Sequence, residues 1–161
     1  MIHIRRHLVS DIPLRVQWLN NPHVNSYLRD TNECTTIQKE KIWFQNYLKS
    51  PHKKFFTIYS YSHPIGFMGL SHITKKSADL FILIGEEKYH GKGLGKKSFQ
   101  WLLDYGFQKL QLDTLRLCVF QKNIPALHLY TSLGFRITKK TRKEIFMKLD
   151  KKDYNGAGGK I

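Results

Sequence analysis

A glycine-rich turn constrains the fold of this chain more than any other feature of its sequence. Residues 91–95 read GKGLG and lie between a strand-like run and a segment whose apolar side chains recur at helical spacing. Glycines let the backbone approach a ligand closely, and the unpaired N–H groups at a helix start face an anion. The turn therefore predicts a phosphate-binding strand-to-helix junction, to which Lys92, Lys96 and Lys97 add positive charge.

Spacing excludes the two commonest phosphate-binding motifs. The Rossmann fingerprint requires glycine where Lys96 stands, and the Walker A loop requires glycine where His90 stands. A purely structural glycine-rich connection remains the alternative to a ligand site.

Hydrophobic periodicity predicts an α/β fold with the element order β-α-α-β-β-β-α-β-α-β-β. Strands are expected at Ile2–Arg6 and at residues 55–61, 65–74, 78–84, 115–120, 135–138 and 144–149. Helices are expected from residue 10 or 11 to 18, from 37 to about 50, from 94 to 109 and from 124 to 133. This order fits a mixed, mostly antiparallel sheet with helices on both faces.

Two helices carry apolar stripes that should face the core, and two carry N-cap residues. The expected inward side chains are Ile37, Trp43, Phe44, Tyr47 and Leu48 in the second helix, and Phe99, Leu102, Leu103 and Phe107 in the third. Thr35 or Thr36 is expected to cap the second helix, and Asn123 the fourth.

The length of the chain predicts a single domain. Its 161 residues, 41% of them apolar, can bury one core, and no polar linker divides residues 1–150. Residues 151–161 carry no packing pattern and are predicted to be a mobile tail.

The distribution of apolar residues predicts where in the cell the protein is located. No stretch approaches the roughly 20 apolar residues that span a bilayer, and the N-terminus lacks the apolar region of a secretory signal. We therefore expect a cytoplasmic protein without a membrane partner.

Cys34 and Cys118 lie far apart and have no zinc-ligand spacing, so free thiols and no metal site are expected.

The formal net charge of +15 predicts an acidic partner. Nucleic acid, an anionic membrane surface or a phosphorylated small molecule would all satisfy it. The basic residues occur as scattered pairs, most of them typical of a solvated surface. They lack the aromatic and basic stripe that binds single strands, so we expect no nucleic-acid partner.

A second motif lies downstream of the turn, where Asn123 precedes a segment that carries Tyr130 three residues before Leu133, Gly134 and Phe135. Together the two motifs resemble the GCN5-related N-acetyltransferase (GNAT) superfamily. Its signature is Gln or Arg, two residues, Gly, one residue, then Gly or Ala, and residues 90–95 (HGKGLG) occupy it. His90 departs from the pattern, which has Gln or Arg at this position.

The resemblance implies an enzyme that transfers an acetyl group from acetyl-CoA to an amine by direct attack. It implies that backbone amides of residues 91–96 hold the pyrophosphate, that the splayed end of the 80–84 strand aligns the pantetheine, and that Asn123 contacts it. The cofactor-binding residues so implied are Leu83, Ile84, His90, Gly91, Lys92, Gly93, Leu94, Gly95, Lys96, Asn123, Ala126 and Tyr130.

Tyr130 is the implied catalytic acid, because a phenol near the thioester sulphur can protonate the departing thiolate. A core aromatic is the alternative for Tyr130. Since an amine is mostly protonated at neutral pH, a base is also needed. His72, Asp79 and Glu86, with Glu87 beside it, are the candidates, and each could equally be an ordinary exposed residue.

The acceptor is the least constrained part of the prediction. Residues 18–24, 73–79 and 113–116 are similar to enzymes that acetylate nucleotide-linked amino sugars, of the pseudaminic acid pathway type. Polycationic acceptors would favour an acidic groove, yet the chain has 12 acidic against 27 basic residues. A nucleotide sugar fits this charge. A protein N-terminal acetyltransferase and a non-catalytic CoA- or nucleic-acid-binding module are the alternatives, and exposed strand edges leave a homodimer open.

Overall fold

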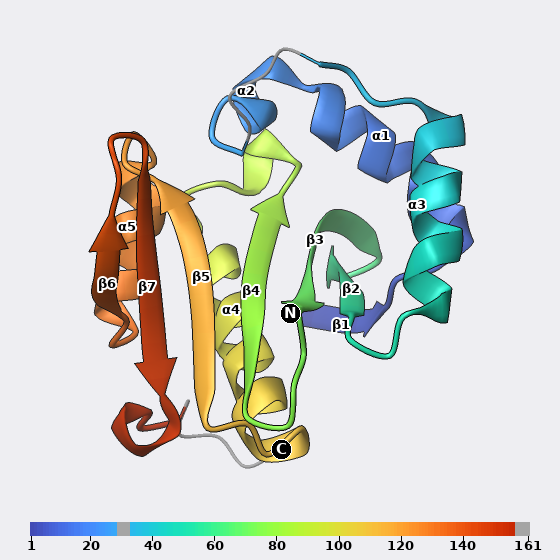
Figure 1. Cartoon of the computed structure of the whole chain (residues 1–161). Coiled ribbons are helices and arrows are strands. Elements are labelled where there is room, and N and C mark those ends of the chain that lie inside the picture. The colour runs from blue at the N-terminus through green and yellow to red at the C-terminus, as the bar shows by residue number, and fades with distance from the viewer. Residues whose placement is uncertain (29–32, 157–161) are drawn as a thin grey trace.

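A seven-stranded sheet forms the centre of the computed structural model, which describes residues 1–28 and 33–156 (Figure 1). The strands are β1 (Ile2–Arg6), β2 (Lys54–Ser60), β3 (His63–Ser71), β4 (Ser77–Ile84), β5 (Thr114–Phe120), β6 (Arg136–Lys140) and β7 (Glu144–Asp150). Their order is β1-β2-β3-β4-β5-β7-β6, and every neighbouring pair is antiparallel except β4 and β5. The mixed, mostly antiparallel sheet predicted from the sequence is confirmed.

Helices pack on both faces of this sheet, as predicted. The α-helices are α1 (Ile12–Asn20), α2 (Pro22–Asn25), α3 (Ile37–Lys49), α4 (Leu94–Asp104) and α5 (Ile124–Ser132). Short turns of helix are η1 (Val9–Asp11), η2 (Glu87–Tyr89), η3 (Tyr105–Lys109, a π-helix) and η4 (Lys151–Asp153). α4 and α5 lie behind the sheet in Figure 1, and α1 and α3 lie on the side of β1 to β4.

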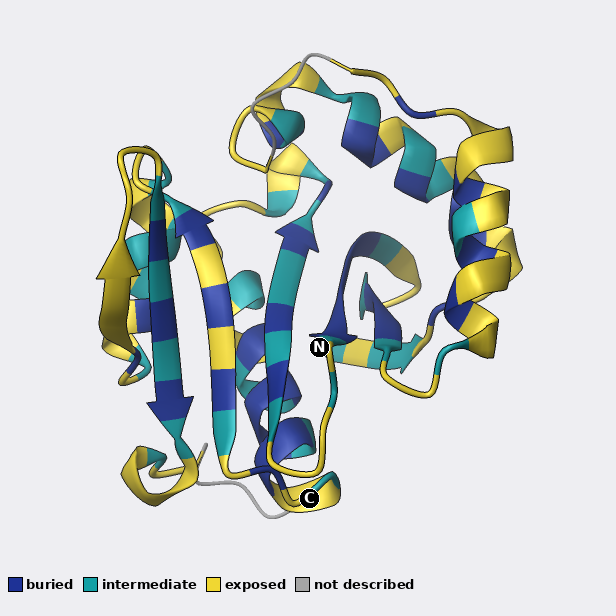
Figure 2. Cartoon of the chain, viewed as in Figure 1, coloured by how far each residue is buried: buried dark blue, intermediate teal, exposed yellow. Residues whose placement is uncertain are grey.

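Side chains on β5 alternate between the core and the solvent, because helices cover only one face of this part of the sheet. In β5, Leu115, Leu117 and Val119 point into the core beneath α4 and α5, whereas Arg116 and Cys118 are exposed. Figure 2 shows this banding on β5. Because α1 and α3 reach only the β2 to β4 part of the opposite face, the β5-β7-β6 part of that face is open.

The core confirms one predicted helix stripe and part of another. Phe99, Leu102, Leu103 and Phe107 are all buried, as predicted. In α3 the buried apolar residues are Phe44 and Tyr47, whereas Ile37 is 45% and Leu48 67% exposed. The prediction that Ile37 and Leu48 belong to the buried stripe of α3 was wrong. α3 packs along a narrow face against α1 and the sheet, and its two ends project beyond that contact.

A buried polar network fixes the start of α1 beneath the sheet. The Thr57 hydroxyl donates a hydrogen bond of 2.8 Å to Asp11, and His7 Nδ1 lies 2.8 Å from the same hydroxyl oxygen. Since the single hydroxyl hydrogen is used on Asp11, His7 Nδ1 must carry a proton and donate it to Thr57. The buried Nε2 of His7 has no hydrogen-bond partner, so a proton on it would be buried without an acceptor. This arrangement requires a neutral imidazole.

Three local features differ from the sequence-based expectation. Pro22 was expected only to end the first helix, but it also begins α2, because proline suits the first position of a helix. The helix expected over residues 94–109 is α-helical only to Asp104 and continues as the π-helix η3. In the expected tail, Tyr154 donates a hydrogen bond of 2.8 Å to Asp104 and packs on Phe107. Residues 157–161 of that tail lie outside the described residues.

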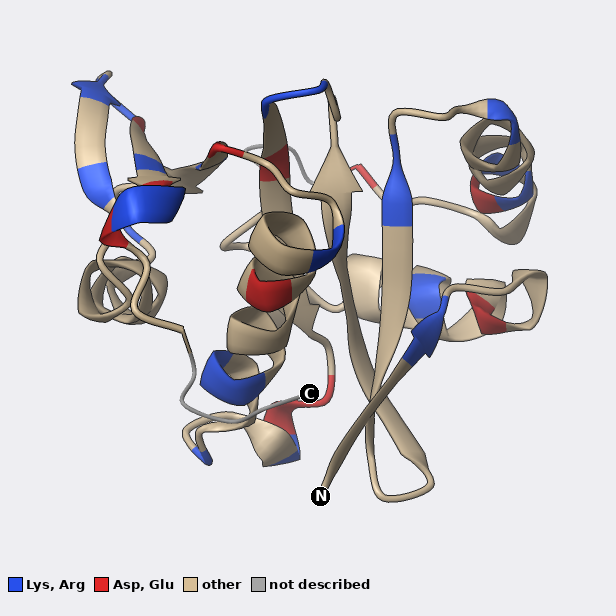
Figure 3. Ribbon diagram, turned by 90° about the horizontal axis from the view of Figure 1, so that it is seen from below, with Lys and Arg blue, Asp and Glu red and all other residues tan. Residues whose placement is uncertain are grey.

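Lysine and arginine side chains are distributed over helices and strands rather than gathered in one block (Figure 3). This agrees with the scattered pairs in the sequence. A localised anion site must therefore come from a particular arrangement of a few residues, not from bulk charge.

Candidate active site

The opening between β4 and β5 is the central feature of the site. The two strands pair in parallel over three rungs, the last of which joins Asp79 to Arg116. Beyond that rung β4 continues to Ile84 and β5 to Phe120 without pairing to each other, and the two arrows diverge in Figure 1. The facing edge of β4 therefore offers its backbone groups to an extended ligand.

A cavity of about 310 Å³ occupies this opening. Its walls are residues 80–82 of β4, residues 118–120 of β5, and Asn123 and Tyr130, with Glu144 and Tyr27 at its edge. We call it the tyrosine cavity. Of the predicted cofactor residues, Asn123 and Tyr130 line it, while Leu83 is buried on the other face of the sheet against α1.

The glycine-rich turn leads from the end of β4 into α4. Gly91 and Gly93 have left-handed φ angles of 70° and 74°, and a Cβ atom on either would meet nothing within 4 Å. Gly93 is the N-cap of α4 and leaves the first N–H groups of the helix, at Leu94, Gly95 and Lys96, without a side-chain cap. The backbone thus forms an open concave surface of N–H groups at a helix start, which suits a phosphate group.

His90 braces this turn against the sheet. Its Nε2 atom lies 2.7 Å from the backbone carbonyl oxygen of Ile84, the last residue of β4. Because a carbonyl can only accept, Nε2 carries the proton and donates it. The irregular residue of the signature thus has a structural contact, and its side chain fixes where the turn begins.

Asn123 caps α5 as predicted. Its Oδ1 accepts a hydrogen bond of 3.3 Å from the backbone N–H of Ala126. The cap uses the N–H of Ala126 and the oxygen of Asn123, so the Nδ2 group of Asn123 is the end of that side chain that remains for a ligand in the tyrosine cavity. Ala126 itself packs at the margin of the core.

Tyr130 sits on the inner face of α5, with its ring centroid 5.1 Å from Phe99 and 6.0 Å from Phe135. It is therefore both a core aromatic and part of the cavity wall, so the two readings of the sequence are compatible. Burial raises the pKa of the Tyr130 phenol to about 12. The group stays protonated at neutral pH and is a proton donor.

Two of the predicted base candidates are in contact with each other. His72 Nδ1 lies 3.1 Å from Asp79 Oδ2, and Arg116 Nε donates a hydrogen bond of 2.9 Å to Asp79 Oδ1. His72 adopts a left-handed φ of 48° after β3, which directs its ring toward β4. The carboxylate of Asp79 thus joins the imidazole to the last β4–β5 rung.

Glu86 and Glu87 occupy a different place from the other candidates. Glu86 accepts a hydrogen bond of 2.9 Å from the indole of Trp18, and Glu87 accepts one of 2.9 Å from the side-chain amide of Asn21. Both fasten the α1–α2 segment to the end of β4. None of the four base candidates lines the tyrosine cavity, but His72 and Asp79 line the two cavities that adjoin it, whereas Glu86 and Glu87 do not.

A second cavity, of about 350 Å³, adjoins the tyrosine cavity on the side of α1 and α3. It shares Phe81 and Ile82 with that cavity, and its walls are rich in aromatic side chains. Its positively charged lining residues are Arg15 and Lys53, and no carboxylate among the described residues lines it. His72 also lines it. We call it the aromatic cavity.

Sequence reasoning missed Arg15 as a member of this cavity wall. Arg15 bonds Glu40 at 2.5 Å and stacks 3.7 Å from the centroid of the Trp43 ring. Its position depends on how α1 meets α3, which no local pattern in the sequence reports.

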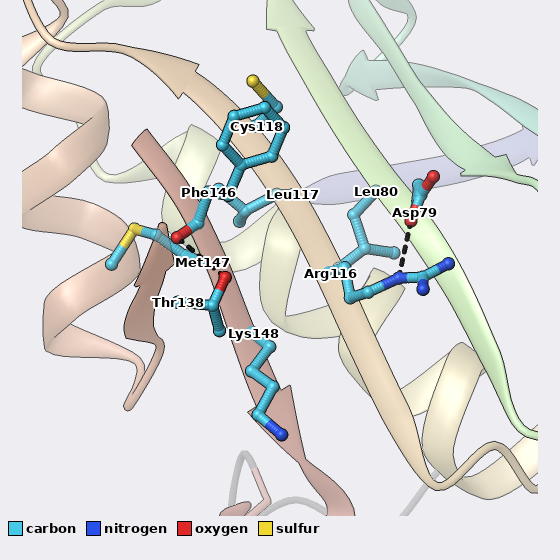
Figure 4. Close-up of a pocket in the computed structure, with 9 residues that line it drawn as sticks. All are labelled: Asp79, Leu80, Arg116, Leu117, Cys118, Thr138, Phe146, Met147 and Lys148. Carbon is cyan, nitrogen blue, oxygen red and sulfur yellow. Dashed lines mark hydrogen bonds and ion pairs between the residues drawn. The ribbon is translucent and has the colours of Figure 1, made fainter. Parts of the chain in front are cut away.

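A third cavity, of about 470 Å³, lies on the open part of the sheet (Figure 4). It shares Leu80 and Cys118 with the tyrosine cavity. Burial, with the Glu144 carboxylate beside it, raises the pKa of the Cys118 thiol to about 11. Cys118 is therefore a thiol at neutral pH and a poor nucleophile, which favours direct transfer over an acyl-cysteine route. We call this the open-face cavity.

The described residues contain no cluster of three or more potential metal ligands. Within the same residues, no helix is long and apolar enough to cross a bilayer.

A sheet that opens beside a helix start suited to an anion, with a buried phenol in the opening, is the arrangement expected of the acyltransferase class that the two sequence motifs resemble. The family is specified by the match of residues 2–136 to the model of the Acetyltransferase (GNAT) domain. The chain belongs to this family and is an acetyltransferase, as its sequence predicted.

Sequence relatives include enzymes with different acceptors in their names. Acetyltransferase PseH of Campylobacter jejuni is 26% identical over 128 residues, which cover 80% of this chain and 78% of that protein. Spermidine N(1)-acetyltransferase of Escherichia coli is 36% identical over 78 residues, 48% of this chain and 41% of that protein.

Solved structures share the fold along nearly the whole chain. Spermidine N-acetyltransferase from Vibrio cholerae, solved with CoA and spermine, superposes with a TM-score of 0.86 at 22% identity and covers 95% of this chain and 97% of its own. Campylobacter jejuni PseH with acetyl coenzyme A has a TM-score of 0.73 at 21% identity and covers 93% and 99%.

Proposed function

We propose that this acetyltransferase uses acetyl-CoA and acetylates the primary amine of a nucleotide-linked amino sugar. The open backbone at Gly91 and Gly93 carries the donor part of the proposal, because a side chain at either position would fill the space that a pyrophosphate needs. The free edge of β4 and the Nδ2 group of Asn123 would bind the pantetheine arm.

Tyr130 and the His72–Asp79 pair would divide the proton transfers. As the amine nitrogen bonds to the acetyl carbon and the carbon–sulphur bond breaks, His72 would accept the amine proton, directly or through one water, and Tyr130 would donate a proton to the thiolate. Asp79 would orient the imidazole through its contact with Nδ1. No covalent enzyme intermediate is needed.

The aromatic cavity adjoins the tyrosine cavity, in which the amine would react, and its lining supports an acceptor that is not a polycation. Arg15 and Lys53 line it and no described carboxylate does, so a polyamine would lack partners there. The match to PseH also covers more of the chain than the match to spermidine N(1)-acetyltransferase, 80% against 48%. This agrees with the narrower resemblance to the pseudaminic acid pathway type.

A polyamine acetyltransferase is the second candidate. The structural similarity to the Vibrio cholerae spermidine enzyme, with a TM-score of 0.86, favours it, but at 22% identity that similarity concerns the fold. The charge distribution of the described residues favours the amino sugar.

We place the reaction in the cytoplasm. Cys34 and Cys118 are both free, as is usual in a reducing compartment.

The test is thiol release from acetyl-CoA with a panel of amines: nucleotide-linked amino sugars, the same sugars without nucleotide, spermidine, and peptides with free N-termini. We expect the highest kcat/KM with a nucleotide-linked amino sugar. Faster turnover of spermidine would move the assignment to the polyamine class, and product mass shifts on peptides alone would move it to protein N-terminal acetylation.

A further inference from the structure

Four charged residues form a single row across the open part of the sheet. Asp79 on β4 is paired in register with Arg116 on β5, Arg116 with Lys148 on β7, and Lys148 with Arg136 on β6. Residues directly opposite each other in a sheet project from the same face. The three basic residues of this row, which we call the cationic row, therefore stand side by side over the uncovered face.

Like charges in direct cross-strand positions destabilise a sheet. The cationic row contains two such pairs in succession, Arg116 with Lys148 and Lys148 with Arg136. Two carboxylates offset them in part: Asp79 binds Arg116 at 2.9 Å, and Asp150 is shared by Arg136 at 2.6 Å and Lys148 at 3.6 Å. Three positive side chains are thus paired with two carboxylates, so one positive charge is left to attract a further anion.

The side chains of the row are accessible to a ligand. Those of Arg116, Lys148 and Arg136 are 48%, 34% and 58% exposed. Arg116 and Lys148 line the open-face cavity of about 470 Å³, together with the ring of Phe146. Figure 4 shows Arg116 and Lys148 on neighbouring strands, with Arg116 beside Asp79.

This cavity adjoins the tyrosine cavity. Leu80 and Cys118 belong to the walls of both the open-face cavity and the tyrosine cavity. Cys118 lies two residues beyond Arg116 along β5, a distance of about 7 Å at the usual rise of a strand. A hexose ring spans a distance of this order, so a sugar amine in the tyrosine cavity would place its anomeric substituent near the cationic row.

We propose that the cationic row is a phosphate subsite, which binds the diphosphate of the acceptor while its amine lies in the tyrosine cavity. This inference rests on the proposed function and adds to it a binding site and the group that the site recognises. Arg116 presents a planar guanidinium to phosphate oxygens, and Lys148 and Arg136 add charge from the next two strands. The subsite would make the enzyme select phosphorylated amines over neutral or cationic ones.

The test compares Lys148→Met and Arg136→Gln, singly and together, with the native enzyme. Arg116 is left intact because it also holds Asp79. Lys41→Gln, on the exposed surface of α3, is the matched control for loss of one positive charge. Each enzyme is assayed with an amino sugar carrying a nucleoside diphosphate and with the same sugar without it. Inorganic pyrophosphate binding is measured by calorimetry in the presence of saturating CoA, which occupies the proposed donor site at the glycine-rich turn.

We expect each single variant to raise KM for the phosphorylated acceptor about tenfold, the double variant to raise it further, and kcat to change little. KM for the phosphate-free sugar should stay the same, and pyrophosphate affinity should fall in parallel. Circular dichroism and the thermal midpoint of each variant establish that it is folded.

Equal KM effects on both acceptors, or unchanged pyrophosphate binding in the double variant, would overturn the subsite. The pyrophosphate calorimetry distinguishes a failure of the proposed acceptor from a failure of the phosphate subsite. If the native protein acetylates only spermidine yet binds pyrophosphate through Lys148 and Arg136, the acceptor assignment fails and the anion site stands. If it acetylates the nucleotide sugar and the variants bind and react as the native enzyme does, the subsite fails alone.

Discussion

The imidazole of His90 and the backbone carbonyl of Ile84 are joined by a hydrogen bond of 2.7 Å, which ties the glycine-rich turn to the end of β4. We expect His90→Ala to weaken acetyl-CoA binding about tenfold, because the bond that sets the turn is lost. His90→Gln, which restores a donor, should recover most of the affinity. Calorimetric titration with acetyl-CoA measures both, and equal affinities in all three proteins would contradict the bracing role.

Gly93→Ala should reduce donor affinity more severely. A Cβ would occupy the space above the helix start, and a left-handed φ of 74° costs alanine about 1 kcal/mol or more. Gly156 is the matched control, since it has a φ of 71° and equally open surroundings but lies in the C-terminal segment. We expect Gly156→Ala to bind acetyl-CoA normally. A comparable loss in both variants would show that the effect is not local.

Tyr130→Phe should lower kcat by about 100-fold while leaving acetyl-CoA affinity unchanged, because the ring keeps its contacts with Phe99 and Phe135 and only the proton donor is removed. Since the pKa of Tyr130 is about 12, the phenol should cause no fall in the native kcat up to pH 9. Unchanged turnover in the variant would reduce Tyr130 to a packing residue.

His72→Gln should lower kcat/KM about 100-fold at neutral pH, because the proposed general base is removed. Asp79→Asn should give a smaller loss, because it removes the group that orients the imidazole but not the imidazole itself. Glu144→Gln, at the edge of the tyrosine cavity, is the comparison. A larger loss of kcat/KM in Glu144→Gln than in His72→Gln would assign the base to Glu144.

His7 predicts a pH dependence of stability that is independent of catalysis. Burial lowers its pKa from 6.5 to about 4, so the unfolded chain takes up a proton at a higher pH than the folded one. Stability from this group is complete above about pH 6.5 and is lost as the pH falls toward 4, in total about 3 kcal/mol. Urea unfolding at pH 7, 6 and 5 measures the slope.

The variant His7→Asn keeps a donor for Thr57 and does not titrate. It should be less stable at pH 7 but show a flatter dependence over this window. An unaltered slope in the variant would assign the effect to another group.

Local patterns in the sequence were sufficient for most of the framework. The alternation at β1 to β5, the caps at Thr36 and Asn123 and the inward face of α4 follow from side-chain periodicity and hydrogen bonding within a few residues. The same local rules failed at the two ends of α3, where exposure of Ile37 and Leu48 depends on how far the neighbouring elements extend.

Some features of the candidate site likewise follow from local sequence, and others depend on the tertiary structure. By itself the sequence determined the glycine-rich turn at residues 91–95 and the helix that carries Tyr130, because glycine conformation and capping are properties of short segments. Only the tertiary structure decided that His72 meets Asp79, that Asp79 ends the pairing with Arg116, and that Lys148 and Arg136 continue that row. These neighbours come from five strands or strand ends, and their contact depends on sheet register, which the whole core sets.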